Sequence, residues 1–232
     1  MANYTLLIPH MLKWEGDYSS DPDDTASSFA TKTKLNGHPI HTNKGITFQT
    51  WVSTSNELGH PKTEQAFLNM TSSQWGKIMK KFYWDKVYGD KIKSQAIAEI
   101  LTEIVWGSGV GGLKQNVILL QKFLKDAGYK IEVDGSIGPQ TVDTINKYVT
   151  EKGKAGENRL YDLIWQSRAN QLKNYKSAWK HLNGWMNRMN DHYKSAMGKL
   201  KELVTDNPIK SGIVSVFLVV GAIFFLTKKF KK

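Results

Sequence analysis

The chain has 232 residues, enough for one large domain or two small ones with a substantial core. Charged residues make up 23% and hydrophobic residues 40%, as in ordinary globular proteins, and the absence of cysteine excludes disulfides and thiolate metal sites. The formal net charge of +11 calls for a polyanionic partner: nucleic acid, anionic lipid or bacterial cell wall. Because no long run of Lys or Arg interrupts the first 200 residues, nucleic acid ranks behind membrane and wall.

The first predicted helix carries the most informative acidic residue. Ile8, Met11 and Leu12 share one helical face. Glu15 continues that face, and Gly16 is well placed to end the helix. At the negative end of the helix dipole and beside apolar neighbours, the Glu15 carboxyl favours its protonated form, which a glycosidase needs to protonate a leaving oxygen. From the spacing alone, a helix that happens to end in Glu-Gly is the simpler interpretation.

Most of the chain beyond this region has helical patterns. The predicted helices cover residues 75–84, 94–106, 113–126, 159–172 and 175–203, the last of them broken near Gly184. The glycine-rich residues 107–112 are predicted to join two helices. Residues 131–133 and the region around 39–48 are the plausible strands, and they fit one small hairpin.

The C-terminal segment is predicted to be a membrane anchor. Residues 212–227 are uncharged and apolar on all sides, and at about 1.5 Å per residue they span about 24 Å. Lys210 and Lys228 can extend toward the interfaces, and the basic residues 228–232 favour the cytoplasmic side. The rest of the chain would then face outward, although Leu6 to Ile8 are too short for a secretory signal. The alternative interpretation of the apolar segment is a buried core helix.

Three short motifs near the N-terminus carry a resemblance to a known family. They are Glu15-Gly16-Asp17-Tyr18, Asp21-Pro22-x-Asp24, and Thr42 ahead of Gly45-Ile46-Thr47. Together they resemble the opening signature of glycoside hydrolase family 108, whose members are lysozyme-like muramidases, many of them phage endolysins. The sequence departs from the family pattern at Asp17, which replaces a glycine, and over residues 25–41, which replace a Gly-Gly turn.

Two later motifs are similar to the second half of the same family module. Residues 133–141, with 119–124 just upstream, are similar to its peptidoglycan-binding region. Asp134-Gly135 makes a tight turn and Pro139 suits the first turn of a helix, so this motif is expected to shape the backbone rather than contact a ligand. Residues 183–188 resemble the closing Gly-Trp-x-x-Arg element. The resemblance spans roughly residues 5–195.

The resemblance implies a mainly α, lysozyme-like helical domain with a small β-hairpin, to which the sequence adds one C-terminal transmembrane helix. We expect a catalytic lobe at 1–110, a helical peptidoglycan-binding lobe packed on it at 111–200, a linker at 201–211, the membrane helix at 212–227 and a basic tail at 228–232. The implied activity is N-acetylmuramidase cleavage of the glycan strands of the bacterial cell wall, in phage-mediated host lysis.

The implied site centres on Glu15 as the general acid. Its partner carboxylate is expected in the loop that follows, where Asp21 and Asp24 are the candidates, and its role as nucleophile or general base stays open. Asp24 and Thr42 resemble the Asp and Thr that follow the catalytic Glu in phage lysozymes of related fold. The expected substrate-binding residues are Tyr18, Trp51, Trp106 and Arg188.

No cofactor or metal is expected, because the six histidines lack a metal-ligand spacing. The expected partners are peptidoglycan glycan strands and the bacterial inner membrane, not nucleic acid, with the catalytic domain facing the periplasm or cell wall. The alternative function is a non-catalytic, membrane-anchored protein that binds peptidoglycan, which Asp17 and the altered segment 25–41 keep open. A basic membrane protein that binds nucleic acid is a third interpretation, based on charge alone.

Overall fold

The structure is a computed structural model, in which residues 1–175 and 178–205 are described. The chain forms two compact units, residues 1–186 and residues 187–232. The predicted membrane helix at 212–227 and basic tail at 228–232 lie outside the described residues, as does the second half of the predicted linker.

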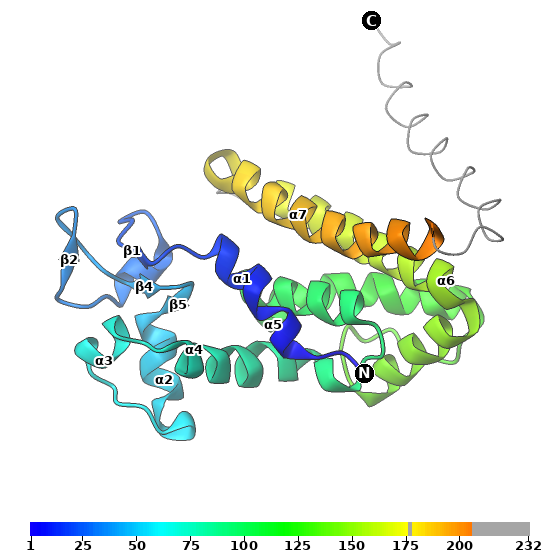
Figure 1. Ribbon diagram of the computed structural model, residues 1–232, viewed down its shortest axis with the longest axis horizontal. Helices are drawn as coiled ribbons and strands as arrows, with labels where there is room; N and C mark the ends of the chain where they lie inside the picture. Colours follow the sequence, from blue (N-terminus) through cyan, green and yellow to red (C-terminus); the bar gives the residue numbers. More distant parts are fainter. Residues whose placement is uncertain (176–177, 206–232) are drawn as a thin grey trace, which may run out of the picture. The chain divides into compact units, whose positions relative to one another are not determined.

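The N-terminal part of the chain forms short elements around two small antiparallel sheets (Figure 1). In chain order these elements are the 3-10 helix η1 (Tyr4–Leu6), α1 (Ile8–Trp14), β1 (Tyr18–Ser19), the 3-10 helix η2 (Thr25–Ser28), β2 (Lys34–Leu35), β3 (His38–Pro39), β4 (Thr42–Asn43) and β5 (Ile46–Thr47). β1 pairs with β4 and β4 with β5, while β2 and β3 form a separate hairpin. The strands predicted around 39–48 are therefore confirmed, and β1 and β2 are additions that the sequence pattern did not reveal.

Threonine caps set the starts of the next three helices. These helices are α2 (Phe48–Leu58), α3 (Glu64–Leu68) and α4 (Ser72–Met79). In each case the side chain of the preceding threonine accepts a hydrogen bond from a backbone N–H of the first turn. α4 continues into a π-helical turn, η3 (Lys80–Trp84), so the helix predicted over 75–84 is confirmed with a wider last turn. Two 3-10 turns follow, η4 (Asp85–Val87) and η5 (Gly89–Lys91).

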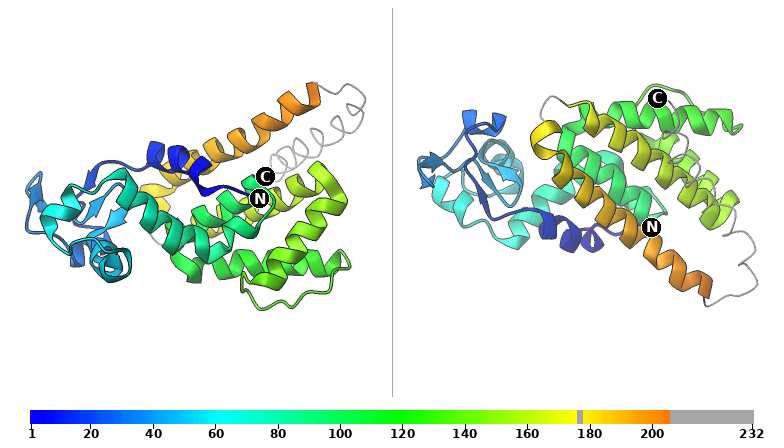
Figure 2. Two further views of the ribbon diagram at one scale, coloured as in Figure 1. Left: turned by 60° about the horizontal axis from the view of Figure 1, so that its bottom comes forward. Right: turned by 90° about the horizontal axis from the view of Figure 1, so that it is seen from above.

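The two longest helices, α5 (Gln95–Asp126) and α6 (Pro139–Lys173), pack side by side (Figure 2). Each consists of two helical segments joined at a glycine with positive φ, Gly109 in α5 (φ 63°) and Gly153 in α6 (φ 59°). The helices predicted over 94–106, 113–126 and 159–172 are confirmed, as is the helix join within residues 107–112.

Residues 131–133 form no strand, so that prediction is wrong. The buried side chain of Gln121 on α5 holds the loop that follows them. Its amide nitrogen donates to Asp134 Oδ1 at 2.8 Å, and its oxygen accepts from the Gly135 N–H at 2.8 Å. Because side-chain hydrogen bonds satisfy this turn, it needs no partner strand. The motif shapes the backbone, as predicted.

One described helix, α5, is long and apolar enough by length and composition to cross a membrane. In its most apolar window, 44% of the residues are buried inside the protein. Its buried residues include Ile97, Leu101, Ile104, Val117 and Leu120, and the helix packs against α6. A core helix passes the same composition test, so this finding does not identify a membrane span.

The last described helix, α7 (Ala178–Thr205), confirms the helix predicted over 175–203. It runs through Gly184 without a break, so the predicted interruption there is wrong. The described residues are thus mainly helical with two small β-sheets, one of them a hairpin, which confirms that part of the predicted fold class.

Candidate active site

Glu15 lies immediately after α1, at the C-cap position. Its backbone N–H donates to the Met11 carbonyl at 3.2 Å, and its backbone is extended (φ −91°, ψ 123°). The helix therefore ends at Trp14, one residue earlier than the apolar pattern predicts. Gly16 is not in the left-handed conformation expected of a helix-terminating glycine. The half-buried Glu15 side chain thus leaves the helix rather than continuing its face.

Two distant segments fix the carboxyl group of Glu15. The indole Nε1 of Trp106, on α5, donates to Glu15 Oε1 at 2.7 Å. The backbone of Gly45 packs so tightly on the other oxygen that a Cβ at this position would lie 2.3 Å from Glu15 Oε2. The same Cβ would lie 2.5 Å from Cζ2 of Trp106. Only glycine fits here, which explains why the Gly-Ile-Thr motif matters to Glu15.

Gly45 belongs to the two-residue turn between β4 and β5. Both turn residues have positive φ, 48° for Lys44 and 76° for Gly45, as the twist of a tight hairpin requires. The turn is held from both sides, because Trp75 Nε1 donates to the Lys44 carbonyl at 2.8 Å and the Lys44 N–H donates to the Asp17 carbonyl at 2.7 Å. These bonds connect the turn to α4 and to the segment that follows Glu15.

Aromatic rings enclose Trp106. Its ring centroid lies 5.6 Å from that of Trp75 and 4.6 Å from that of Tyr83. Burial raises the pKa of the Tyr83 phenol, and the negative charge of Glu15 adds to this shift against the effect of a hydrogen bond with Thr50. The Tyr83 hydroxyl is therefore neutral at physiological pH and presents a polar group close to the Glu15 charge.

A pocket of about 140 Å³ opens beside Glu15. Its lining residues are Leu12, Glu15, Asp17, Lys44, Ser72 and Trp75. The lining thus includes two acidic residues, one lysine, one serine and two apolar residues, a composition suited to a polar, ring-shaped ligand. Sequence reasoning missed Asp17, Lys44, Ser72 and Trp75 as pocket residues. Asp17 had left one signal, since it replaces a glycine of the family pattern.

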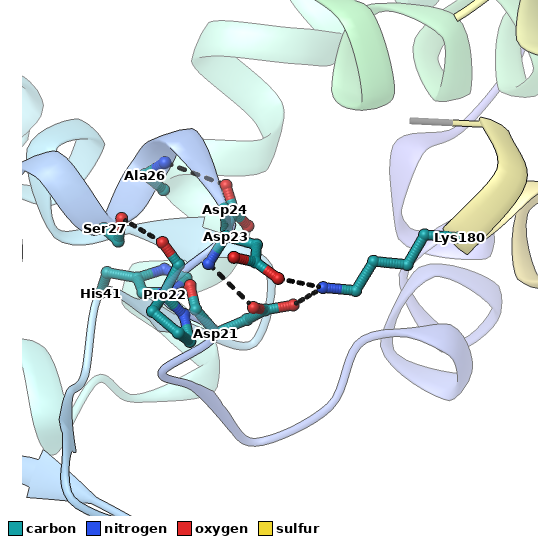
Figure 3. A network of polar contacts seen from close by, with 8 residues as sticks. All are labelled: Asp21, Pro22, Asp23, Asp24, Ala26, Ser27, His41 and Lys180. Atoms are coloured by element: carbon teal, nitrogen blue, oxygen red, sulfur yellow. Dashed lines mark hydrogen bonds and ion pairs between the residues drawn. The ribbon is translucent and has the colours of Figure 1, made fainter. Parts of the chain in front are cut away.

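The acidic loop that contains Asp21, Asp23 and Asp24 is held mostly by itself (Figure 3). Asp24 Oδ1 accepts from the Ala26 N–H at 2.9 Å and caps η2. Asp21 Oδ1 accepts from the Asp23 N–H at 3.0 Å. The ammonium group of Lys180, on α7, lies 3.0 Å from both Asp21 Oδ2 and Asp23 Oδ2. Its hydrogen bond lowers the pKa of the Asp21 carboxyl, and the Asp23 N–H adds to that shift.

Thr42 is connected to this loop through a buried histidine. Nδ1 of His41 lies 2.9 Å from Thr42 Oγ1, and Nε2 lies 3.1 Å from the Asp21 carbonyl oxygen. Because a carbonyl can only accept, Nε2 donates, and in the neutral ring Nδ1 accepts from the Thr42 hydroxyl. The structure therefore joins two of the predicted catalytic residues, Thr42 and Asp21, through a residue that the sequence analysis had not singled out.

The four predicted substrate-binding residues have different environments. Trp51 is fully buried, donates to the Pro61 carbonyl at 2.8 Å and packs on His60, so its ring has no exposed face to offer a sugar. Tyr18 is 42% exposed, with its hydroxyl donating to the Leu68 carbonyl at 2.7 Å. The indole N–H of Trp106 donates to Glu15, as described above. Arg188 is a residue of α7 in the second unit.

Metal ligation finds no support in the part of the chain that is described. Among residues 1–175 and 178–205, no three His, Asp or Glu side chains come together in a group that could hold a metal ion. The pocket chemistry of these residues is that of carboxyl groups, one amine and aromatic rings.

Comparisons with known proteins agree with the motifs. The profile of glycosyl hydrolase 108 matches residues 8–109, and that of a predicted peptidoglycan domain matches residues 115–190. A solved structure described as that of Brucella abortus SagA has a similar fold, with a TM-score of 0.59 and 22% sequence identity over 84% of this chain and 94% of that one. No curated protein matches the sequence. Residues 8–109 thus match glycosyl hydrolase family 108 and are followed by a region that matches a peptidoglycan domain, and a chain with these two regions is a peptidoglycan hydrolase.

Proposed function

We propose that this peptidoglycan hydrolase is an N-acetylmuramidase that cleaves glycan strands with Glu15 as the general acid. The observation that carries the proposal is the placement of the Glu15 carboxyl at a pocket, between the Trp106 indole N–H and the Gly45 backbone. A carboxyl group held by groups this rigid keeps one orientation toward a bound sugar, as efficient proton transfer requires.

In the proposed reaction, Glu15 protonates the glycosidic oxygen as the bond to the anomeric carbon breaks. A second carboxylate, for which we propose Asp24, then assists water as a base or attacks as a nucleophile. Asp21 is the alternative partner. Thr42, which His41 joins to the acidic loop, is proposed to position the water or the sugar. The exposed ring of Tyr18 is the proposed stacking surface for the glycan.

Product analysis tests the bond that is cut. Purified walls are digested, the new reducing ends are reduced with borohydride, and the sugar alcohols are identified after acid hydrolysis. A muramidase yields reduced muramic acid. Reduced glucosamine alone would show cleavage of the other glycosidic bond, and new amino termini without new reducing ends would show that the peptide is cut instead.

Glu15→Gln tests the acid. Gln keeps the size of the side chain and accepts from Trp106, but it has no acidic proton. We therefore expect lysis of walls in a zymogram to fall by about 10²- to 10⁴-fold, with an unchanged melting temperature. Near wild-type lysis by Glu15→Gln would contradict the assignment. A folded wild-type protein that binds walls without any lysis would support the non-catalytic alternative.

We further propose that residues 212–227 anchor the enzyme in the bacterial inner membrane, with residues 228–232 in the cytoplasm and the catalytic region facing the wall during phage-mediated lysis. The support is the uncharged apolar sequence between lysines. An anchored enzyme gains effective concentration near its polymer. Truncation before Pro208 should release a soluble protein that still cleaves purified walls. Protease added outside spheroplasts should digest the catalytic region, and a protected catalytic region with an accessible lysine tail would contradict this topology.

A further inference from the structure

We infer that Lys44 binds a carboxylate carried by the side chain of the muramic acid sugar, and so makes the enzyme selective for peptidoglycan over uncharged glycans. This inference rests on the proposed cleavage of glycan strands at the Glu15 pocket. In the sequence motif, Lys44 is only a residue between Thr42 and Gly45, and the resemblance gave it no role. The structure makes Lys44 one of the residues that line the pocket itself.

The backbone of the β4–β5 turn fixes where Lys44 lies. The hydrogen bonds from Trp75 and to Asp17 hold its peptide groups, and the next residue, Gly45, packs on the Glu15 carboxyl. Asparagine or glycine is the usual residue at the first position of such a turn, because lysine is strained at positive φ. A lysine in this conformation therefore lowers the stability of the fold. Residues strained in this way cluster at functional sites, which motivates a functional role for the Lys44 side chain.

The charges around the pocket explain why a cation is needed there. Asp17 lines it together with the proposed acid Glu15, so an anionic group on a substrate meets the like charge of Asp17 on entering. Lys44 is the basic residue of the lining. Among the described residues it forms no ion pair within 4.0 Å with either carboxylate or with any other. Lys44 is half-buried as a residue, and its ammonium group is thus available to a ligand.

The substrate supplies a matching anion. Muramic acid differs from the other sugar of the glycan strand by a lactyl ether, which ends in a carboxylate in peptide-free strands and carries a peptide with further carboxylates in intact walls. Chitin oligosaccharides have the same glycosidic linkage and no carboxylate. A lysine is suited to this variety, because its flexible stem presents a point charge rather than a fixed fork.

The test compares three substrates and three full-length variants. The substrates are intact walls, peptide-free glycan strands and chitin oligosaccharides. Lys44→Gln removes the charge at similar length, Lys44→Arg keeps it, and Lys77→Gln removes one charge from an exposed position of α4 that does not line the pocket. For Lys44→Gln we expect KM on carboxylate-bearing substrates to rise about fivefold, with kcat and chitin cleavage unchanged. Lys44→Arg should restore KM, and Lys77→Gln should behave as wild type.

The arms separate the sources of the carboxylate. A KM effect on peptide-free strands identifies the lactyl carboxylate, whereas an effect confined to intact walls identifies the peptide carboxylates. Either result supports the inference, and a high-salt buffer should reduce the effect. An equal loss on all three substrates, or an effect matched by Lys77→Gln, overturns it.

Binding measurements keep this test independent of catalysis. Dissociation constants of peptide-free strands are measured for Glu15→Gln and for the double variant with Lys44→Gln. About fivefold weaker binding by the double variant supports the inference even if the wild-type protein fails to cut glycan and the proposed reaction is wrong. Equal binding overturns the inference even if Glu15 proves to be the acid.

Discussion

Glu15 and the acidic loop at Asp21 to Asp24 are close in sequence but are held in opposite ways. The Glu15 carboxyl depends on Trp106, which lies 91 positions later, and on the backbone of Gly45. Asp24 hydrogen-bonds only two positions away, and Asp21 does so with Asp23. Two contacts connect the loop to more distant residues, one from His41 to the Asp21 backbone carbonyl and one from Lys180 to the Asp21 and Asp23 carboxylates.

This difference separates two ways of building a catalytic carboxylate. The position of Glu15 is a property of the assembled fold, so substitutions far from it in sequence should change its chemistry. The conformation of the acidic loop is largely encoded locally by turn and cap hydrogen bonds, so its shape should survive the loss of a single charge. Substitutions that remove a charge or a contact while keeping the shape can test each side of the comparison.

The largest expected effect in the loop comes from Asp24→Asn. Asn caps a helix as well as Asp does, so the bond to the Ala26 N–H is kept and only the charge is lost. If Asp24 is the second carboxylate, kcat on walls should fall by about 10²-fold or more. Asp21→Asn is the matched control and should reduce kcat less. An equal or larger loss for Asp21→Asn would reverse the proposed roles of the two residues.

Gly45→Ala should break the precise placement of Glu15. The new Cβ would overlap Glu15 Oε2 and the Trp106 ring, so the carboxyl must shift, and a misplacement of about 1 Å can cost about 10²-fold in rate. The positive φ adds strain of about 1–2 kcal/mol to the folded state. The loss of rate is measured as kcat on walls, and the loss of stability as the free energy of unfolding in denaturant.

Gly37→Ala is the control for this strain. Gly37 also has positive φ (83°), in the β2–β3 turn, but a Cβ there meets no atom within 4 Å. It should lose a similar amount of stability while keeping its kcat. If the two variants lose activity equally, the contact between Gly45 and Glu15 has no catalytic importance.

Trp106→Phe tests the hydrogen bond alone. Phe keeps an aromatic ring beside Tyr83 but loses the N–H that donates to Glu15 Oε1. We expect kcat to fall about tenfold, since a hydrogen bond to a charged group is worth about 1.5–3 kcal/mol, with a smaller change in KM. Trp84→Phe loses an equivalent bond, from a buried indole to Asp90 Oδ1 at 2.8 Å, away from the pocket. A similar fall in kcat for both variants would show that lost packing, not orientation of Glu15, is responsible.

The sequence was informative where the structure is local. The apolar spacing placed α1 and put Glu15 at its end, and the glycine-rich stretch marked the join in α5. Turn residues predicted that the Asp134-Gly135 motif would shape the backbone, and hydrogen bonds with the Gln121 side chain hold that turn in place. In each case the apolar spacing, the glycines or the hydrogen bonds that define the feature involve residues close together in the sequence.

The contacts of the pocket could not be predicted in this way. Trp106 was expected to bind substrate, and no local pattern shows that its N–H reaches a carboxyl 91 positions away. Trp51 was expected to do the same, but its helix face turns it into the core against His60. Asp17 and Lys44 enter the pocket through a turn packed against the end of α1. Such positions follow from tertiary packing, which residue spacing does not record.

The smallest expected effect comes from Lys180→Met, which removes the long-range ion pairs of the acidic loop. Lys180 lowers the pKa of Asp21, and the two aspartates raise the pKa of Lys180. A carboxyl whose pKa is lowered by folding adds stability above its unfolded value of 3.8, and this stability is lost as pH falls through the lower folded value. The lysine contribution is complete below its unfolded value of 10.5 and is lost as pH rises through the raised folded value.

Lys180→Met should therefore melt slightly below wild type near pH 7, and the difference should vanish at about pH 2, where the carboxylates are protonated. Because these groups are exposed, added salt should also reduce the difference. Melting curves of the two proteins across this pH range measure it directly. A difference that persists unchanged at low pH would mean that the Lys180 side chain stabilises the loop through packing of its methylene groups. The position of the acidic loop would then depend on packing against α7, just as the position of Glu15 depends on Trp106.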